Sequence, residues 1–218
     1  MIKSKEGINE IIARSKLLIN NSLNDENIKQ TVGLFGYTEP KLTTGKTLLE
    51  TVEMLQQSQS KEYGEQYQAK SDLETKHKQT HGDYMDLLTI CRIALRNDVG
   101  AQQGLGLNQT RKASYSGWLA QSLLFCNNLI TNPDYTLKLE EFGQNIEKIQ
   151  AIKKAILETQ MLNEKYNNEK GEAQQATKDR DQKIDELNQW VSDYTKIVRI
   201  ALKKRPQLLE KLGIMVRS

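Results

Sequence analysis

The chain has 218 residues, of which 37% are apolar and 27% charged, and its formal net charge at neutral pH is +3. So small a charge does not indicate a nucleic-acid-binding protein, and an aromatic content of 6% argues against a base-stacking surface. The N-terminus lacks the apolar core of a signal peptide, and the chain has no apolar run of the ~18 residues that span a bilayer. We therefore expect a cytoplasmic protein without membrane insertion.

The sequence predicts an all-α fold. Proline is rare, with three residues, and the abundant Gln, Lys, Glu and Leu favour helices over strands. Helices are expected over 8–21 and 114–130, with a short extra helix over 25–34. The two cysteines, Cys91 and Cys126, lie among apolar residues, so we expect small core side chains in a reduced compartment and no disulfide framework.

Much of the sequence occurs twice. Residues 64–107 align without a gap on residues 171–214, and 14 of the 44 aligned positions are identical; roughly two or three would agree by chance at average composition. The constant offset of 107 predicts a tandem duplication, with a first helical module over 1–107 and a second over 108–218. We expect the two modules to pack together as one pseudo-two-fold bundle.

Each module is predicted to contain a long helical hairpin that turns at a glycine, Gly64 in the first and Gly171 in the second. In the second module the two arms are expected over 137–169 and 173–204. Its returning arm carries apolar residues spaced by three and four, a pattern typical of packed antiparallel helices; these residues are Ile184, Leu187, Val191, Tyr194, Val198 and Ala201. The predicted architecture is an antiparallel four-helix bundle with shorter capping helices.

The start of the first arm has two interpretations. Tyr37-Thr38 and Tyr135-Thr136 each stand seven residues before a glycine, which pairs them at an offset of 98 and makes the connection in the second module shorter. The alternative keeps the offset of 107 and pairs Phe35-Gly36 with Phe142-Gly143.

The returning arms become apolar almost all round, over 90–95 and 197–202. We expect Ile93 and Ile200 to be covered there by neighbouring helices. Arg92 and Arg199 interrupt the two apolar runs. Either they lie at an exposed rim or form structural ion pairs, or they are a pair of cations that grip an acidic partner.

Three motifs resemble functional sites. Residues 44–47, Thr-Gly-Lys-Thr, match the end of a phosphate-binding loop, but Pro40 stands where that loop needs a glycine, so nucleotide binding is not expected. Glu74, His77 and His81 share a helix face and could ligate a metal, although His77 aligns with Ile184 and is better explained as a core histidine. Ser114 or Ser116 is expected to cap the second leading helix, with Trp118 docked in the bundle end.

Positive charge gathers near the C-terminus. Residues 1–107 hold 13 basic and 14 acidic residues, whereas residues 108–218 hold 18 and 14. A candidate partner-binding stripe is formed by Lys196, Arg199, Lys203, Lys204 and Arg205; the alternative is that these cations only complement the negative end of the last long helix.

No combination of residues indicates a catalytic site, so the sequence favours a non-enzymatic scaffold that binds another protein and needs no cofactor. A homo-oligomer remains open, while nucleic acid and membrane insertion are disfavoured. The rival hypotheses are a binder of anionic polymer or lipid headgroups through the basic stripe, and a metal-binding helical bundle.

Overall fold

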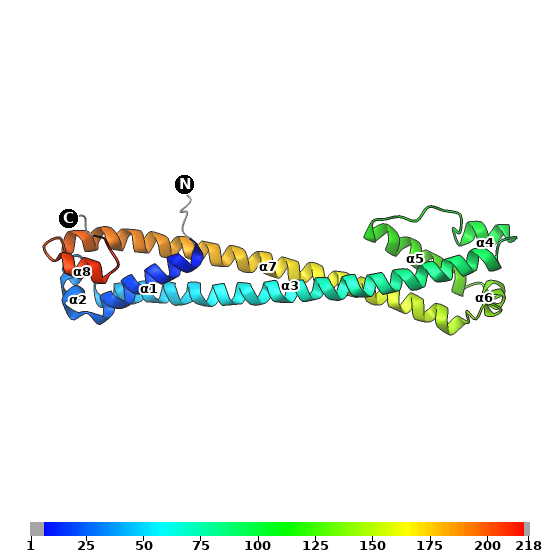
Figure 1. The fold of residues 1–218 in the computed structure, drawn as a ribbon, viewed down its shortest axis with the longest axis horizontal. Helices are drawn as coiled ribbons and strands as arrows, with labels where there is room; N and C mark the ends of the chain where they lie inside the picture. The colour runs from blue at the N-terminus through cyan, green and yellow to red at the C-terminus, as the bar shows by residue number, and fades with distance from the viewer. Residues whose placement is uncertain (1–6, 216–218) are drawn as a thin grey trace. The chain divides into compact units, whose positions relative to one another are not determined.

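A computed structural model of the chain describes residues 7–215, and every regular element in that range is a helix. Figure 1 shows two long helices, α3 and α7, with short helices beside their ends. The elements in chain order are α1 (Ile8–Asn24), α2 (Glu26–Gly33), α3 (Glu39–Ala94), α4 (Val99–Gly104), α5 (Tyr115–Ile130), α6 (Pro133–Glu140), α7 (Ile146–Ala201) and α8 (Pro206–Lys211).

The order of the helices repeats along the chain. Helices α2, α3 and α4 begin and end 107 residues before α6, α7 and α8, and α1 begins 107 residues before α5. Both long helices contain 56 residues. The helix expected over 25–34 is therefore present as α2, but it is not an extra element, because α6 is its counterpart in the second half.

The predicted turns at Gly64 and Gly171 are wrong. Helix α3 runs through Gly64 and α7 runs through Gly171 without interruption. A glycine weakens a helix interior by roughly 1 kcal/mol relative to alanine, and the neighbouring Glu, Gln, Lys and Ala residues are strong helix formers that tolerate this cost. The two hairpins are consequently absent, and the four-helix bundle built from them is not confirmed.

The offset of 98 is also wrong, and the ungapped alternative describes the helix boundaries. Gly36 and Gly143 have φ angles of 82° and 70°, and each follows a short helix. Tyr37 N–H donates to the Val32 carbonyl and Gly36 N–H to the Gly33 carbonyl, and the same pair of bonds recurs around Gly143. This is the Schellman arrangement, which needs a left-handed residue after the helix. Helix α7 therefore starts at Ile146 and not at 137.

The chain divides into two compact units, and each has its own hydrophobic core. The first unit combines residues 1–63 with 171–218, and the second is the continuous segment 64–170. In the first unit, α1, α2 and α8 pack with the N-terminal part of α3 and the C-terminal part of α7; in the second, α4, α5 and α6 pack with the other halves of the long helices (Figure 1). Each unit thus takes part of its chain from each predicted module.

The apolar spacing predicted for the returning arm is confirmed in the first unit. Ile184, Leu187, Val191, Tyr194 and Val198 are all buried in its core, and Ala201 packs against them. Tyr194 donates a hydrogen bond of 2.6 Å to the buried hydroxyl of Ser22 on α1. The buried face of α7 therefore packs against the short helices of this unit.

The predicted burial of Ile93 and Ile200 is wrong, since their exposed fractions are 49% and 60%. Cys91 is buried two residues before Ile93, and two residues turn a helix by about 200°, which places the isoleucine on the outer face. The predicted core position of the cysteines is confirmed: Cys91 and Cys126 are buried in the second unit, and both are free. Burial raises the pKa of both thiols to about 12, so neither is a reactive thiolate at neutral pH.

Candidate interaction surfaces

The predicted basic stripe lies at the end of α7 and in the turn that follows. Lys196 and Arg199 are on α7, Lys203 and Lys204 lie in the turn, and Arg205 immediately precedes α8; all five side chains are exposed. Lys196 forms an ion pair of 3.0 Å with Asp193. An exposed pair of this kind contributes little to stability, so the stripe remains an accessible cationic surface.

Arg92 and Arg199 have different surroundings although they occupy matching positions. In the second unit the Arg92 Nε donates to the Leu107 carbonyl at 2.8 Å, which makes Arg92 a structural residue that holds the segment after α4. Arg199 makes no hydrogen bond or ion pair with any residue that the structure describes. The two arginines are therefore not an equivalent pair of gripping cations.

Arg199 lies at the edge of a groove in the first unit, between α1, α7 and the segment after α8. The groove has a volume of about 240 Å³. Its apolar lining comes from Leu18, Val191, Leu212, Ile214 and Met215, and it also includes Arg14 and Arg199. We call this the Arg199 groove. Its lining therefore combines apolar side chains with two arginines.

The candidate metal ligands Glu74, His77 and His81 are not brought together. The Glu74 side chain is 68% exposed and lies 3.6 Å from the Lys70 ammonium. His77 packs edge-on against the Trp118 ring at 4.3 Å, and burial together with the nearby His81 lowers its pKa. None of the residues that the structure describes forms a hydrogen bond with its Nε2. This is the environment of a core histidine held in its neutral form.

Trp118 is the main neighbour of that histidine and is itself buried, as predicted. The hydroxyl of Ser114 accepts a hydrogen bond from the Gly117 N–H and caps α5. The capping serine therefore sets the start of the helix that carries the tryptophan into the core of the second unit.

The Thr-Gly-Lys-Thr segment lies inside α3 and has a packing role. A Cβ added at Gly45 would stand 2.5 Å from atoms of the Trp190 ring. Trp190 in turn packs against Tyr37 and Tyr194, with ring centroids 5.8 and 5.1 Å away. A glycine at position 45 allows the Trp190 ring to lie close to the α3 backbone. This packing accounts for the glycine without a role in phosphate binding.

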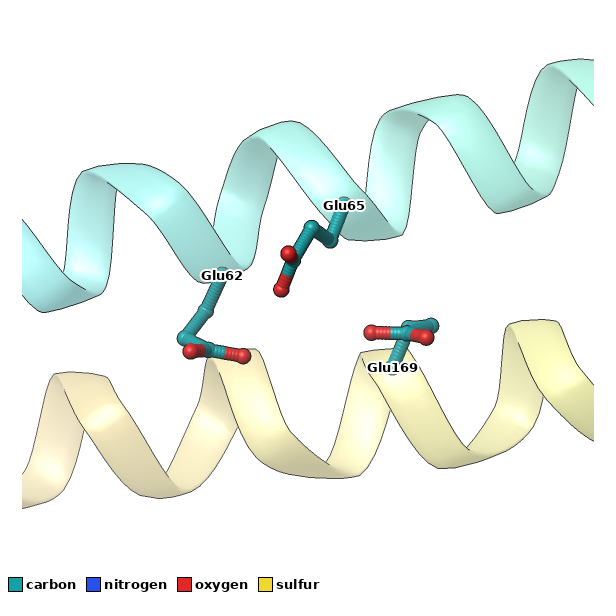
Figure 2. Close-up of side chains that lie close together, drawn as sticks. All are labelled: Glu62, Glu65 and Glu169. Carbon is teal, nitrogen blue, oxygen red and sulfur yellow. The ribbon is translucent and has the colours of Figure 1, made fainter.

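Sequence reasoning missed one acidic group. Figure 2 shows Glu62 and Glu65, one turn apart on α3, and Glu169 on α7. Glu65 and Glu169 belong to the second unit and bring carboxylate oxygens within 4.8 Å of each other. Such acidic neighbours are common on helix surfaces, and nothing else at this position indicates a cation.

Large apolar side chains are exposed at the same positions in both halves of the chain. The pairs are Leu17 and Leu124 (46% and 60%), Phe35 and Phe142 (45% and 44%), Met54 and Met161 (62% and 61%), and Ile93 and Ile200 (49% and 60%). Single exposed apolar residues are ordinary on protein surfaces. Here, however, the residue type and the exposure recur together at four pairs of positions.

Comparison of the chain with family models, with curated proteins and with solved structures produced no match. Over the residues that the structure describes, no helix combines the length and apolar character required to cross a membrane.

Proposed function

We propose that this protein is a non-enzymatic helical scaffold that binds another protein through exposed apolar positions present in both of its units. The four pairs of exposed apolar residues carry this proposal. An exposed apolar side chain contributes little to folding, so its recurrence at matching positions is best explained by contact with a partner.

The proposal includes the tandem duplication. The common offset of the helix boundaries and the matching left-handed glycines support it, in addition to the aligned sequence. A duplicated scaffold would carry the same type of binding surface twice, once in each unit, and would bind a partner with two such sites more tightly than either unit alone.

The test compares the protein with a variant in which Phe35, Phe142, Ile93 and Ile200 are all changed to serine. We expect recovery of the bound partner from the native cells, measured by quantitative mass spectrometry, to fall at least tenfold. A control variant changes the exposed Thr44 and Ala151 to serine, and should recover as much partner as the parent. Equal recovery by all three proteins, each with parental helicity, would contradict the proposal.

The exposed basic stripe supports a second candidate function, the binding of anionic polymer or lipid headgroups. Its test is binding to RNA, DNA and anionic vesicles over a series of salt concentrations. If phosphate contacts drive binding, affinity will fall steeply with salt, and reversal of Lys196, Lys203 and Lys204 to glutamate will abolish it. Salt-independent or absent binding would remove this candidate.

A further inference from the structure

The second unit has an acidic groove between α3 and α7, with a volume of about 320 Å³. Its apolar lining includes Ile90 and Ile152, which are only partly buried, and the exposed Ala151. Asp83 and Asp86, one turn apart on α3, also line it. Both carboxylates are exposed, and neither forms an ion pair with any residue that the structure describes. We call this site the acidic groove.

The matching position in the first unit is occupied by aromatic rings. At the offset of 107, Asp83 and Gln144 of the groove correspond to Trp190 and Tyr37, and the centroids of these two rings lie 5.8 Å apart. Asp86 corresponds to Asp193, which is already ion-paired. A groove with two unpaired carboxylates therefore belongs to the second unit and has no equivalent in the first.

The charge of the groove indicates what it can bind. Of the described residues that line it, Lys148 alone is cationic, and its ammonium donates to the Gly143 carbonyl at 2.7 Å. The two carboxylates are thus left without a positive neighbour in the groove. Surfaces that bind each other carry opposite charges around their apolar contacts. The groove is therefore complementary to an exposed apolar side chain flanked by cations.

The first unit carries such a set of side chains at the end of α7. Lys196 and Ile200 lie one turn apart on the helix, and Lys203 follows in the next turn of the chain. All three are exposed, and Ile200 keeps 60% of its surface. The ion pair of Lys196 with Asp193 is itself exposed and costs little to exchange.

The second unit lacks this set. The residues that correspond to Lys196, Ile200 and Lys203 are Thr89, Ile93 and Arg96, so only one of the two cations has a counterpart. Each unit therefore carries one of the two complementary surfaces. Contact through them joins the first unit of one copy to the second unit of another, and two like units do not match.

We propose that the acidic groove binds the end of α7 from a second copy of this chain. Ile200 lies against the apolar lining of the groove, and Lys196 and Lys203 lie beside Asp83 and Asp86. The contact is heterologous, because different surfaces of the two copies meet, and it adds further copies into chains or rings. This inference goes beyond the proposed function, because it concerns copies of the chain and needs no other protein.

Sedimentation of the purified full chain over a range of concentrations provides the first test. We expect the average mass to rise with concentration at low salt and to fall as salt is added, because surface ion pairs are screened. Charge reversal on either surface, Asp83→Lys with Asp86→Lys or Lys196→Glu with Lys203→Glu, should weaken association at least about tenfold, because like charges then meet. An equimolar mixture of the two variants should associate again, since each retains one intact surface.

The control variant has the same charge change outside the groove. Glu140→Lys with Glu141→Lys alters two exposed residues of the second unit that do not line the groove, and it should associate as the parent does. Circular dichroism of all three variants should give the parental helicity.

Cross-linking locates the contact. A carbodiimide, which joins carboxylates directly to lysines, is applied to a mixture of isotope-labelled and unlabelled chains. It should link Asp83 or Asp86 of one copy to Lys196 or Lys203 of another, and mass spectrometry identifies the mixed pairs.

Four outcomes would overturn the inference. They are a mass that does not depend on concentration, equal weakening in the control variant, a mixture of the two charge-reversed variants that stays monomeric, and a monomeric chain whose basic stripe binds anionic vesicles or RNA instead. The proposed function is tested separately, through recovery of another protein by the variant of the exposed apolar pairs. Failure of one therefore leaves the other standing.

Discussion

At the scale of single residues, close packing decides the role of the glycines in the long helices. Gly45 touches the Trp190 ring, whereas Gly64 on the same helix has no atom within 4 Å of the position of an added Cβ. Two glycines with the same local helical conformation therefore have opposite tolerance for a side chain, and the sequence alone does not distinguish them.

We expect Gly45→Ala to destabilise the protein by about 1–3 kcal/mol, because the indole ring must move within an aromatic cluster. Gly64→Ala should stabilise the protein by about 0.5–1 kcal/mol, since alanine reduces the conformational entropy of the unfolded chain and fits an exposed helix. Urea unfolding of both variants provides the measurement. Similar midpoints for the two would show that Trp190 does not restrict Gly45.

The lowered pKa of His77 predicts that the stability of the folded protein depends on pH. Burial against Trp118 and the neighbouring His81 lower its pKa in the folded state below the ordinary value of 6.5. Protonation of His77 is therefore less favourable in the folded state than in the unfolded state. The contribution of neutral His77 to the free energy of unfolding is fully present above pH 6.5 and is lost as the pH falls through the folded pKa. Ile184, the residue at the matching position, is buried in the first unit and does not titrate.

The variant His77→Ile should consequently lose less thermal stability than the parent between pH 7.5 and pH 5. The control is His81→Gln at the exposed neighbouring position, which should keep most of the parental pH dependence. Melting temperatures of the three proteins at both pH values test the expectation. An identical loss in His77→Ile and in the parent would mean that His77 is not the group responsible.

At the scale of the elements, helices α2, α4, α6 and α8 are each followed by a glycine with a positive φ angle. Gly36 and Gly143 occupy the same position after α2 and α6, and nothing lies within 4 Å of an added Cβ at either one. A side chain there would meet no neighbour, so any cost of substitution comes from the backbone conformation itself.

Gly36→Ala and Gly143→Ala should each cost about 1–2 kcal/mol, the penalty of the left-handed conformation for an L-residue. The control Gly33→Ala lies within α2, where an added Cβ also has no neighbour within 4 Å, and should be neutral or slightly stabilising. Chemical unfolding distinguishes the three variants. A neutral effect at Gly36 and Gly143 would contradict the Schellman geometry.

At the scale of the whole molecule, the compact units differ from the repeated sequence unit. The second compact unit is continuous in sequence and contains a complete core. A chain of residues 64–170 should therefore fold alone as a cooperative, helical monomer. In a fragment of residues 1–107, residues 1–63 belong to the first compact unit and residues 64–107 to the second. This fragment should therefore fold only by pairing with a second copy.

Circular dichroism and light scattering of the two fragments test this prediction. A helical, cooperatively melting monomer from residues 1–107 would show that the repeated sequence is itself the folding unit. An unfolded fragment 64–170 would show that its core depends on the rest of the chain. The parent protein, measured under the same conditions, provides the reference for helicity.

The sequence by itself determined the helical class and the buried face of α7 in the first unit. These features depend on helix propensity and on apolar residues spaced by three and four, and both are properties of residues close together in the sequence. Cys91, Cys126 and Trp118 could be assigned to the core for the same reason.

Only the tertiary structure decided what the glycines do and which segments share a core. Gly64 and Gly171 suggested turns because glycine is common in turns. Glycine also adopts helical backbone angles, however, when the neighbouring residues form a helix. The outward position of Ile93 and Ile200 likewise depends on which helix face the short helices cover. The Arg199 groove joins residues of α1 with residues of α7 and of the segment after α8, which lie far apart in the sequence.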